Sequence, residues 1–69
     1  MTRPNVQSLE YYRHVVALGL AETHACPPGV VAALMDDYGE ALHGCWAIGA
    51  AAIVPIKLLY AEWKTFRAV

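Results

Sequence analysis

The stretch from Ala41 to Tyr60, ALHGCWAIGAAAIVPIKLLY, holds twenty residues with a single formal charge, which lies at Lys57. Up to Val54, the side chains around this stretch leave no polar side that would face water if the stretch were a helix. A helix that is apolar all round belongs in a protein core or in a membrane. The stretch therefore predicts a buried or membrane-embedded helix, around which the rest of the chain is arranged.

Length and composition point the same way. The chain has 69 residues, of which 58% are hydrophobic and 16% charged, against about 25% charged in an ordinary soluble domain. A chain of this size buries only about 60% of the surface that it exposes when unfolded. We therefore expect lipid, copies of the chain itself or a larger complex to cover part of the apolar surface.

The sequence predicts an all-α fold of two helices joined as a hairpin, in a single small domain. Apolar residues recur at spacings of three and four from residue 6 to residue 23, which indicates an amphipathic helix. Residues 24–29 contain Pro27 and Pro28, which break a helix and permit a tight turn. A long helix is then predicted over residues 30–67, kinked or broken near Pro55.

A heptad pattern runs through this second half. Apolar or small residues follow an unbroken four-three spacing, which is typical of a helix-packing seam. We call these residues the heptad seam: Val31, Met35, Tyr38, Leu42, Cys45, Gly49, Ala52, Ile56, Leu59, Trp63 and Phe66. Its small members permit another helix to approach closely. The predicted helix-packing interface consists of Ala41, Cys45, Gly49, Ala52, Ile56, Leu59 and Trp63.

The aromatic residues at the two ends of the apolar segment, residues 41–60, suggest a membrane span. Tyr38 lies 22 residues before Tyr60 and 25 before Trp63, or about 33 to 38 Å along a helix, close to the thickness of a bilayer. The predicted interfacial anchors are Tyr38, Tyr60, Trp63, Lys64 and Arg67. The basic C-terminal end predicts a membrane protein with a cytoplasmic C-terminus and a lipid bilayer as a partner.

These patterns give two main hypotheses of function. The first is a small non-catalytic accessory subunit of a membrane complex, which packs against other subunits through its Ala- and Gly-rich helix. The alternative is a helical structural component of a soluble or virion assembly, in which the heptad seam over residues 31–66 packs against copies of the chain. A net charge of −1 provides no basic surface for nucleic acid.

Candidate chemistry is sparse. Without a nucleophile motif or a phosphate-binding loop, no enzymatic activity, metal or cofactor is predicted. His43, framed by Gly39, Gly44 and Ala47, is a candidate ligand for a pigment or haem, although a histidine hydrogen-bonded to a neighbouring helix is the simpler interpretation. Cys26 and Cys45 lie too far apart on the predicted hairpin for an internal disulfide. Cys26 is then either a free thiol or a link between two copies.

Overall fold

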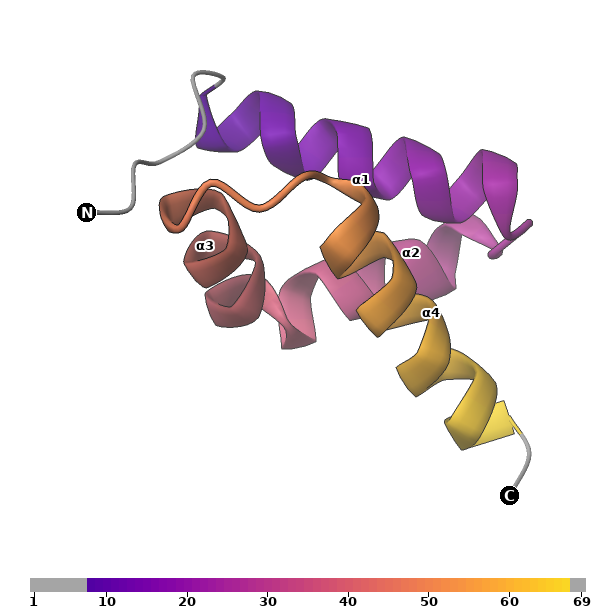
Figure 1. Ribbon diagram of the computed structural model, residues 1–69. Coiled ribbons are helices and arrows are strands. Elements are labelled where there is room, and N and C mark those ends of the chain that lie inside the picture. The colour runs from indigo at the N-terminus through magenta and orange to yellow at the C-terminus, as the bar shows by residue number, and fades with distance from the viewer. Residues whose placement is uncertain (1–7, 68–69) are drawn as a thin grey trace.

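The computed structural model describes residues 8–67, and their side chains as far as Thr65. This part of the chain forms four α-helices and contains no strand. They are α1 (Leu9–Thr23), α2 (Pro28–Asp37), α3 (Gly39–Ala47) and α4 (Ile53–Arg67) (Figure 1). The predicted all-α class is confirmed, whereas the predicted arrangement of two helices in a hairpin is not found.

Helix α1 is stabilised by an N-terminal cap and by one stripe of buried side chains. The Ser8 side chain accepts a hydrogen bond of 3.1 Å from the Tyr11 main-chain N–H, and so satisfies a donor that the helix cannot pair internally. Tyr12, Val16 and Leu20, spaced by four residues, are all buried. The helix ends at Thr23 as predicted, but it begins at Leu9: Ser8, which the prediction included in the helix, is its extended N-cap, and residues 6 and 7 lie outside the described residues.

The connection from α1 to α2 consists of residues 24–27, with the sequence HACP. Ala25 adopts a positive φ of 53°, and the Cys26 N–H donates to the Leu20 carbonyl at 3.1 Å, which closes the end of α1. Pro27 caps α2, and Pro28 occupies its first position. A proline is well placed there because its missing N–H would have no partner within the helix.

The predicted long helix over residues 30–67 is wrong: the chain forms α2, α3 and α4 there instead. The first break is at Tyr38, which ends α2 and precedes α3. Asp36 and Asp37 lie at the C-terminal end of α2, where negative charge is unfavourable because this end of the helix dipole is itself negative. Starting a new helix at Gly39 places Glu40 in the first turn of α3, where negative charge is favourable.

The second break is a Schellman motif at the end of α3. Gly49 has a φ of 79°, a left-handed conformation that glycine adopts without a steric penalty. The Gly49 N–H donates to the Trp46 carbonyl and the Ala50 N–H to the Cys45 carbonyl, at 3.1 and 3.0 Å. This pair of bonds satisfies the carbonyls at the end of the helix.

Helix α4 begins with Pro55 as its third residue. The Ile56 N–H donates to the Ala52 carbonyl at 3.2 Å, so Ala52 begins the first turn. A proline in the first turn removes no hydrogen bond within the helix. The break predicted near Pro55 therefore lies just before it, at residues 48–52, and Pro55 is part of the restart.

The breaks also overturn the predicted membrane span. The longest described helices, α1 and α4, have 15 residues each. No helix in the described part of the chain combines the length and the apolar character that crossing a bilayer requires. The predicted transmembrane helix, and with it the predicted location in a membrane with a cytoplasmic C-terminus, is wrong.

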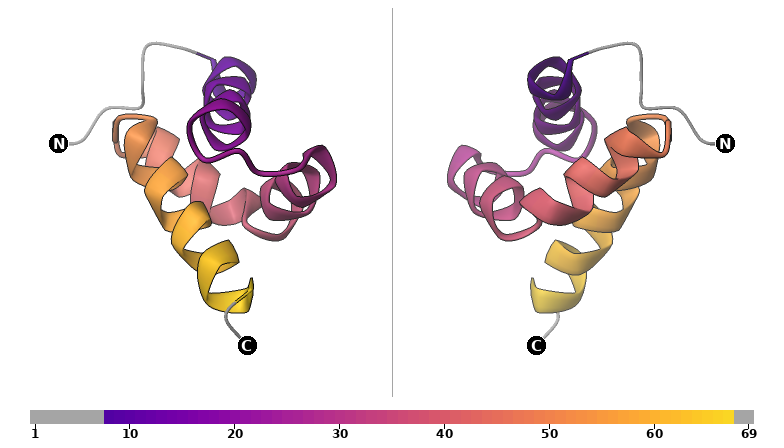
Figure 2. Two further views of the ribbon diagram at one scale, coloured as in Figure 1. Left: turned by 90° about the vertical axis from the view of Figure 1, so that its right-hand side faces the viewer. Right: turned by 90° about the vertical axis from the view of Figure 1, so that its left-hand side faces the viewer.

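The four helices enclose one core. Helix α1 packs against each of the other three, which lie on one side of it (Figure 2). The hydrophobic core consists of Tyr12, Val16, Leu20, Cys26, Val31, Leu34, Met35, Leu42, Ile56 and Leu59. Helices α1 and α4 approach closely at Gly19, where a Cβ atom would overlap Ile56 Cδ1. The C-terminal half of α4 projects away from α1 (Figure 1).

Candidate functional site

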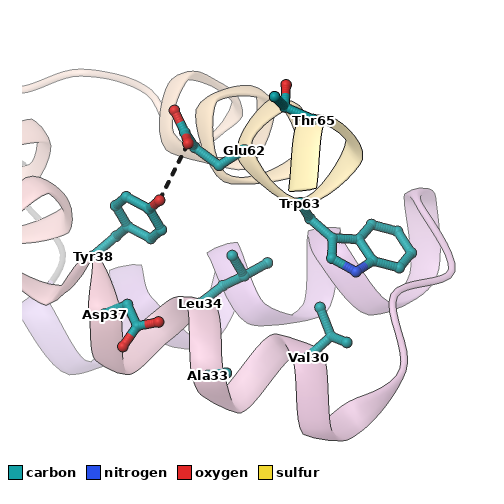
Figure 3. Close-up of a pocket in the computed structure, with 8 residues that line it drawn as sticks. All are labelled: Val30, Ala33, Leu34, Asp37, Tyr38, Glu62, Trp63 and Thr65. Atoms are coloured by element: carbon teal, nitrogen blue, oxygen red, sulfur yellow. Dashed lines mark hydrogen bonds between the residues drawn. The ribbon is translucent and has the colours of Figure 1, made fainter. Parts of the chain in front are cut away.

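A groove of about 510 Å³ separates α2 from the C-terminal half of α4 (Figure 3). Its volume lies within the range of about 300 to 1,000 Å³ that is typical of binding pockets. We call it the α2–α4 groove. Its lining residues are Val30, Ala33, Leu34, Asp37, Tyr38, Glu62, Trp63 and Thr65.

The two ends of the groove differ in character. Val30 on α2 and the Trp63 indole on α4 make one end apolar (Figure 3). At the other end, the Tyr38 hydroxyl donates a hydrogen bond of 3.2 Å to Glu62 Oε2 and so connects the two walls. Asp37 lies beside Tyr38 at this acidic end (Figure 3). Burial and the neighbouring carboxylates of Glu62 and Asp37 raise the pKa of the Tyr38 phenol above its ordinary value.

Aromatic contacts position the α4 wall. The His24 ring, in the α1–α2 connection, stacks on Tyr60 with ring centres 3.9 Å apart and planes 13° apart. Tyr60 in turn contacts Trp63, with ring centres 6.1 Å apart. This row of rings ties the projecting half of α4 to the connection before α2. The groove thus offers an indole, an aliphatic wall and two carboxylates, which are groups that bind apolar and cationic side chains.

A second surface is formed by exposed residues of α4, among which Leu58 borders a hollow between α3 and α4. Six residues spaced by one, three and four positions are all exposed there, and we call them the outer face of α4: Ile53, Val54, Lys57, Leu58, Ala61 and Lys64. Ile53, Val54 and Leu58 keep 49%, 42% and 54% of their surface exposed. Ile48, in the connection just before α4, is 60% exposed. This surface combines large apolar side chains with two lysines.

The structure divides the predicted helix-packing interface among several environments. Ile56 and Leu59 belong to the core of the domain itself. Ala41 and Cys45 line a smaller hollow of about 170 Å³ between α3 and α4. Gly49 and Ala52 lie in the α3–α4 connection, where Gly49 makes the turn, and Trp63 lines the α2–α4 groove.

The predicted interfacial anchors are also separated. Tyr38 and Trp63 meet in the α2–α4 groove. Tyr60 is half-buried under His24, and Lys64 is exposed on the outer face of α4. The side chain of Arg67 lies outside the described residues.

His43, Cys26 and Cys45 lie outside the α2–α4 groove. His43 is exposed on α3, and its ring stacks on Trp46 with the ring centres 5.8 Å apart. It lines neither the groove nor the smaller hollow. Cys26 is buried, Cys45 is half-buried, and no disulfide joins them. No group of three or more potential metal ligands gathers within the described residues.

The sequence patterns did not identify the groove. Tyr38 and Glu62 are 24 residues apart, and a continuous helix would hold them about 36 Å apart. The signal that could have revealed the groove is Gly49 after an apolar helical run, since glycine is the usual residue at a helix C-terminus.

We compared the chain with models of known protein families, with characterised proteins and with solved structures, and none of them matches it.

Proposed function

We propose that this chain is a small, non-catalytic structural module that associates with copies of itself through the outer face of α4. The observation that carries the proposal is that Ile53, Val54 and Leu58 are all exposed on one helix, with Val54 and Leu58 one turn apart. Exposed apolar residues that gather in one patch are typical of interaction surfaces, whereas single ones are ordinary.

The fold favours the outer face of α4, rather than the heptad seam, as the contact between copies. Five seam residues are buried in the core of the domain: Val31, Met35, Leu42, Ile56 and Leu59. They fill the interior of one copy, so they are not accessible to another. An interface between copies must therefore use residues that the domain leaves outside, and the outer face of α4 is such a set.

Energetics favour Leu58 as the centre of the contact. Fully burying a leucine side chain contributes about 1.5 to 3 kcal/mol, and more than half of the Leu58 surface is exposed in one copy. The net charge of −1 adds little repulsion between copies. A contact centred on Leu58 therefore gains apolar burial at a small electrostatic cost.

Sedimentation velocity over a wide range of protein concentration tests the proposal. We expect the chain to associate as the concentration rises and Leu58→Glu to remain monomeric. Leu18→Glu is the matched control, because Leu18 is likewise a large apolar residue exposed to 43%, but it belongs to α1 and not to α4. Circular dichroism verifies that each variant keeps its helices, and Leu58→Ala provides a milder change. A chain that stays monomeric throughout, or a Leu58→Glu variant that associates like the original, contradicts the proposal.

A further inference from the structure

The α2–α4 groove and the outer face of α4 have complementary chemistry. The acidic end of the groove carries Asp37 and Glu62, both of which are exposed. Within residues 8–65, neither carboxylate forms an ion pair with a basic side chain. One oxygen of Glu62 accepts the Tyr38 hydroxyl, and a carboxylate has capacity for further donors. A cation supplied by another molecule would find acceptors there.

The outer face of α4 presents such a cation within an apolar surface. Lys57 is exposed and lies between Ile53 on the preceding turn and Leu58 beside it. The remainder of the groove, from Val30 to Trp63, is apolar and fits aliphatic side chains. A helix that places its apolar side chains in a groove between two other helices is a common mode of recognition.

We propose that the α2–α4 groove of one copy receives the outer face of α4 of a second copy, with Lys57 of the second copy at Glu62 and Asp37 of the first. This inference rests on the proposed function and specifies the surface that the outer face meets. Leu58 and Ile53 of the second copy lie along the apolar wall of Val30 and Leu34. Charge and shape together favour this register, because Lys57 is the lysine next to Ile53 and Leu58, whereas Lys64 lies two turns further along α4, beyond these apolar residues.

Charge reversal provides a specific test. Lys57→Glu and Glu62→Lys each put like charges together between identical copies. When the two variants are mixed in equal amounts, each pair of unlike copies has two contacts. In one, the glutamate that Lys57→Glu introduces faces the lysine that Glu62→Lys introduces. In the other, the unchanged Lys57 of one variant faces the unchanged Glu62 of the other. We expect each variant alone to raise the Kd of association about tenfold, and the mixture to recover most of that loss.

The control mixture pairs Lys57→Glu with Glu22→Lys. Glu22 is exposed near the end of α1 and does not line the groove, and its reversal changes the net charge as Glu62→Lys does. Glu22→Lys by itself should associate like the original chain, and it should recover the association of the Lys57→Glu chains less than Glu62→Lys does, because it offers no lysine at residue 62. In a Trp46→Phe background, Trp63 is the sole tryptophan, and its fluorescence should change on association because it lines the groove.

The outcomes separate the two proposals. If the unchanged chain associates but the mixture of Lys57→Glu and Glu62→Lys fails to recover, the groove is not the partner surface, although the proposed function stands. Equal recovery of the Lys57→Glu chains by Glu22→Lys and by Glu62→Lys, or association without any change of Trp63 fluorescence, also overturns the inference. If the unchanged chain never associates, the proposed function itself fails.

Discussion

The hydroxyl of Tyr12 donates a hydrogen bond of 2.9 Å to the main-chain carbonyl of Ala50, which follows 38 residues later in the chain. A second, longer contact of 3.4 Å reaches the Ala51 carbonyl. Tyr12 is 1% exposed, so its ring lies in the core while its hydroxyl reaches the connection between α3 and α4. One side chain of α1 thus fixes the segment where the chain turns from α3 into α4.

Tyr12→Phe tests this hydrogen bond. Removing the hydroxyl leaves the apolar ring in place but deletes a buried donor, which should lower the free energy of unfolding by about 1 to 2 kcal/mol. Tyr11→Phe is the matched control, since Tyr11 is 53% exposed, and it should change stability by less than about 0.5 kcal/mol. Urea unfolding followed by circular dichroism measures both. Equal effects of the two substitutions would show that the Tyr12 hydroxyl has no special role.

Gly49→Ala tests the Schellman motif that ends α3. Because Gly49 has a φ of 79°, a Cβ atom there should cost about 1 to 2 kcal/mol of stability. Gly44→Ala is the opposite case: Gly44 lies inside α3, and a Cβ atom added there would meet no other part of the fold within 4 Å. Alanine at this position should therefore stabilise the fold by about 0.5 to 1 kcal/mol. Thermal unfolding of both variants gives the comparison, and a stabilising Gly49→Ala would contradict the left-handed turn.

Gly19→Ala tests the close approach of α1 and α4. Alanine favours a helix by about 1 kcal/mol over glycine, but its Cβ would overlap Ile56 Cδ1 and lie 3.1 Å from Cγ1. Overpacking of this kind typically costs about 1 to 3 kcal/mol, so we expect a net loss of stability. Ile56→Val removes Cδ1, and the double variant should be more stable than Gly19→Ala alone. Simple additivity in this double-mutant cycle would mean that the two residues are not in contact.

Alkaline pH should weaken the fold through Tyr38. The folded state raises the pKa of this phenol from its ordinary value of 10.0, because burial and the Glu62 carboxylate disfavour the phenolate. The stabilisation is therefore fully present below pH 10 and is lost as the pH rises through the higher folded-state pKa. Tyr38→Phe removes this contribution, so its stability should fall less steeply above about pH 10 than that of the original chain. Parallel pH profiles for the two proteins would contradict the role of Tyr38.

Thiol labelling should distinguish the two cysteines. Cys26 is 4% exposed, whereas Cys45 is only half-buried. A thiol reagent added to the folded protein should label Cys45 first, and Cys26 should react only when the chain unfolds. Cys45→Ser leaves Cys26 as the sole thiol and makes its protection directly measurable. Rapid labelling of Cys26 in that variant would show that the thiol is accessible enough to link two copies.

The heptad seam illustrates how a correct pattern led to a wrong geometry. The four-three spacing predicted a helix-packing seam, and five of its members, Val31, Met35, Leu42, Ile56 and Leu59, lie in the core of the domain itself. The same pattern suggested one long helix because it continues across Gly49 and Pro55. Spacing records which side chains avoid water, and it is equally satisfied by a chain that turns and packs its own segments together.

The groove could not be predicted for a related reason. Asp37, Tyr38, Glu62 and Trp63 gather there only because the chain reverses between α3 and α4. Asp37 and Tyr38 adjoin the start of α3, while Glu62 and Trp63 lie in the projecting half of α4. Local patterns carry no information about which distant segments meet.

The sequence by itself determined the helical class, the break at Pro27 and Pro28, and most of the buried positions, because these follow from local backbone preferences and from the avoidance of water. Only the tertiary structure decided that the apolar stretch from Ala41 to Tyr60 is divided between α3 and α4. A twenty-residue apolar segment can bury itself in lipid as one helix or against its own chain as two. The left-handed turn at Gly49, held by the Tyr12 hydroxyl from across the core, selects the second arrangement.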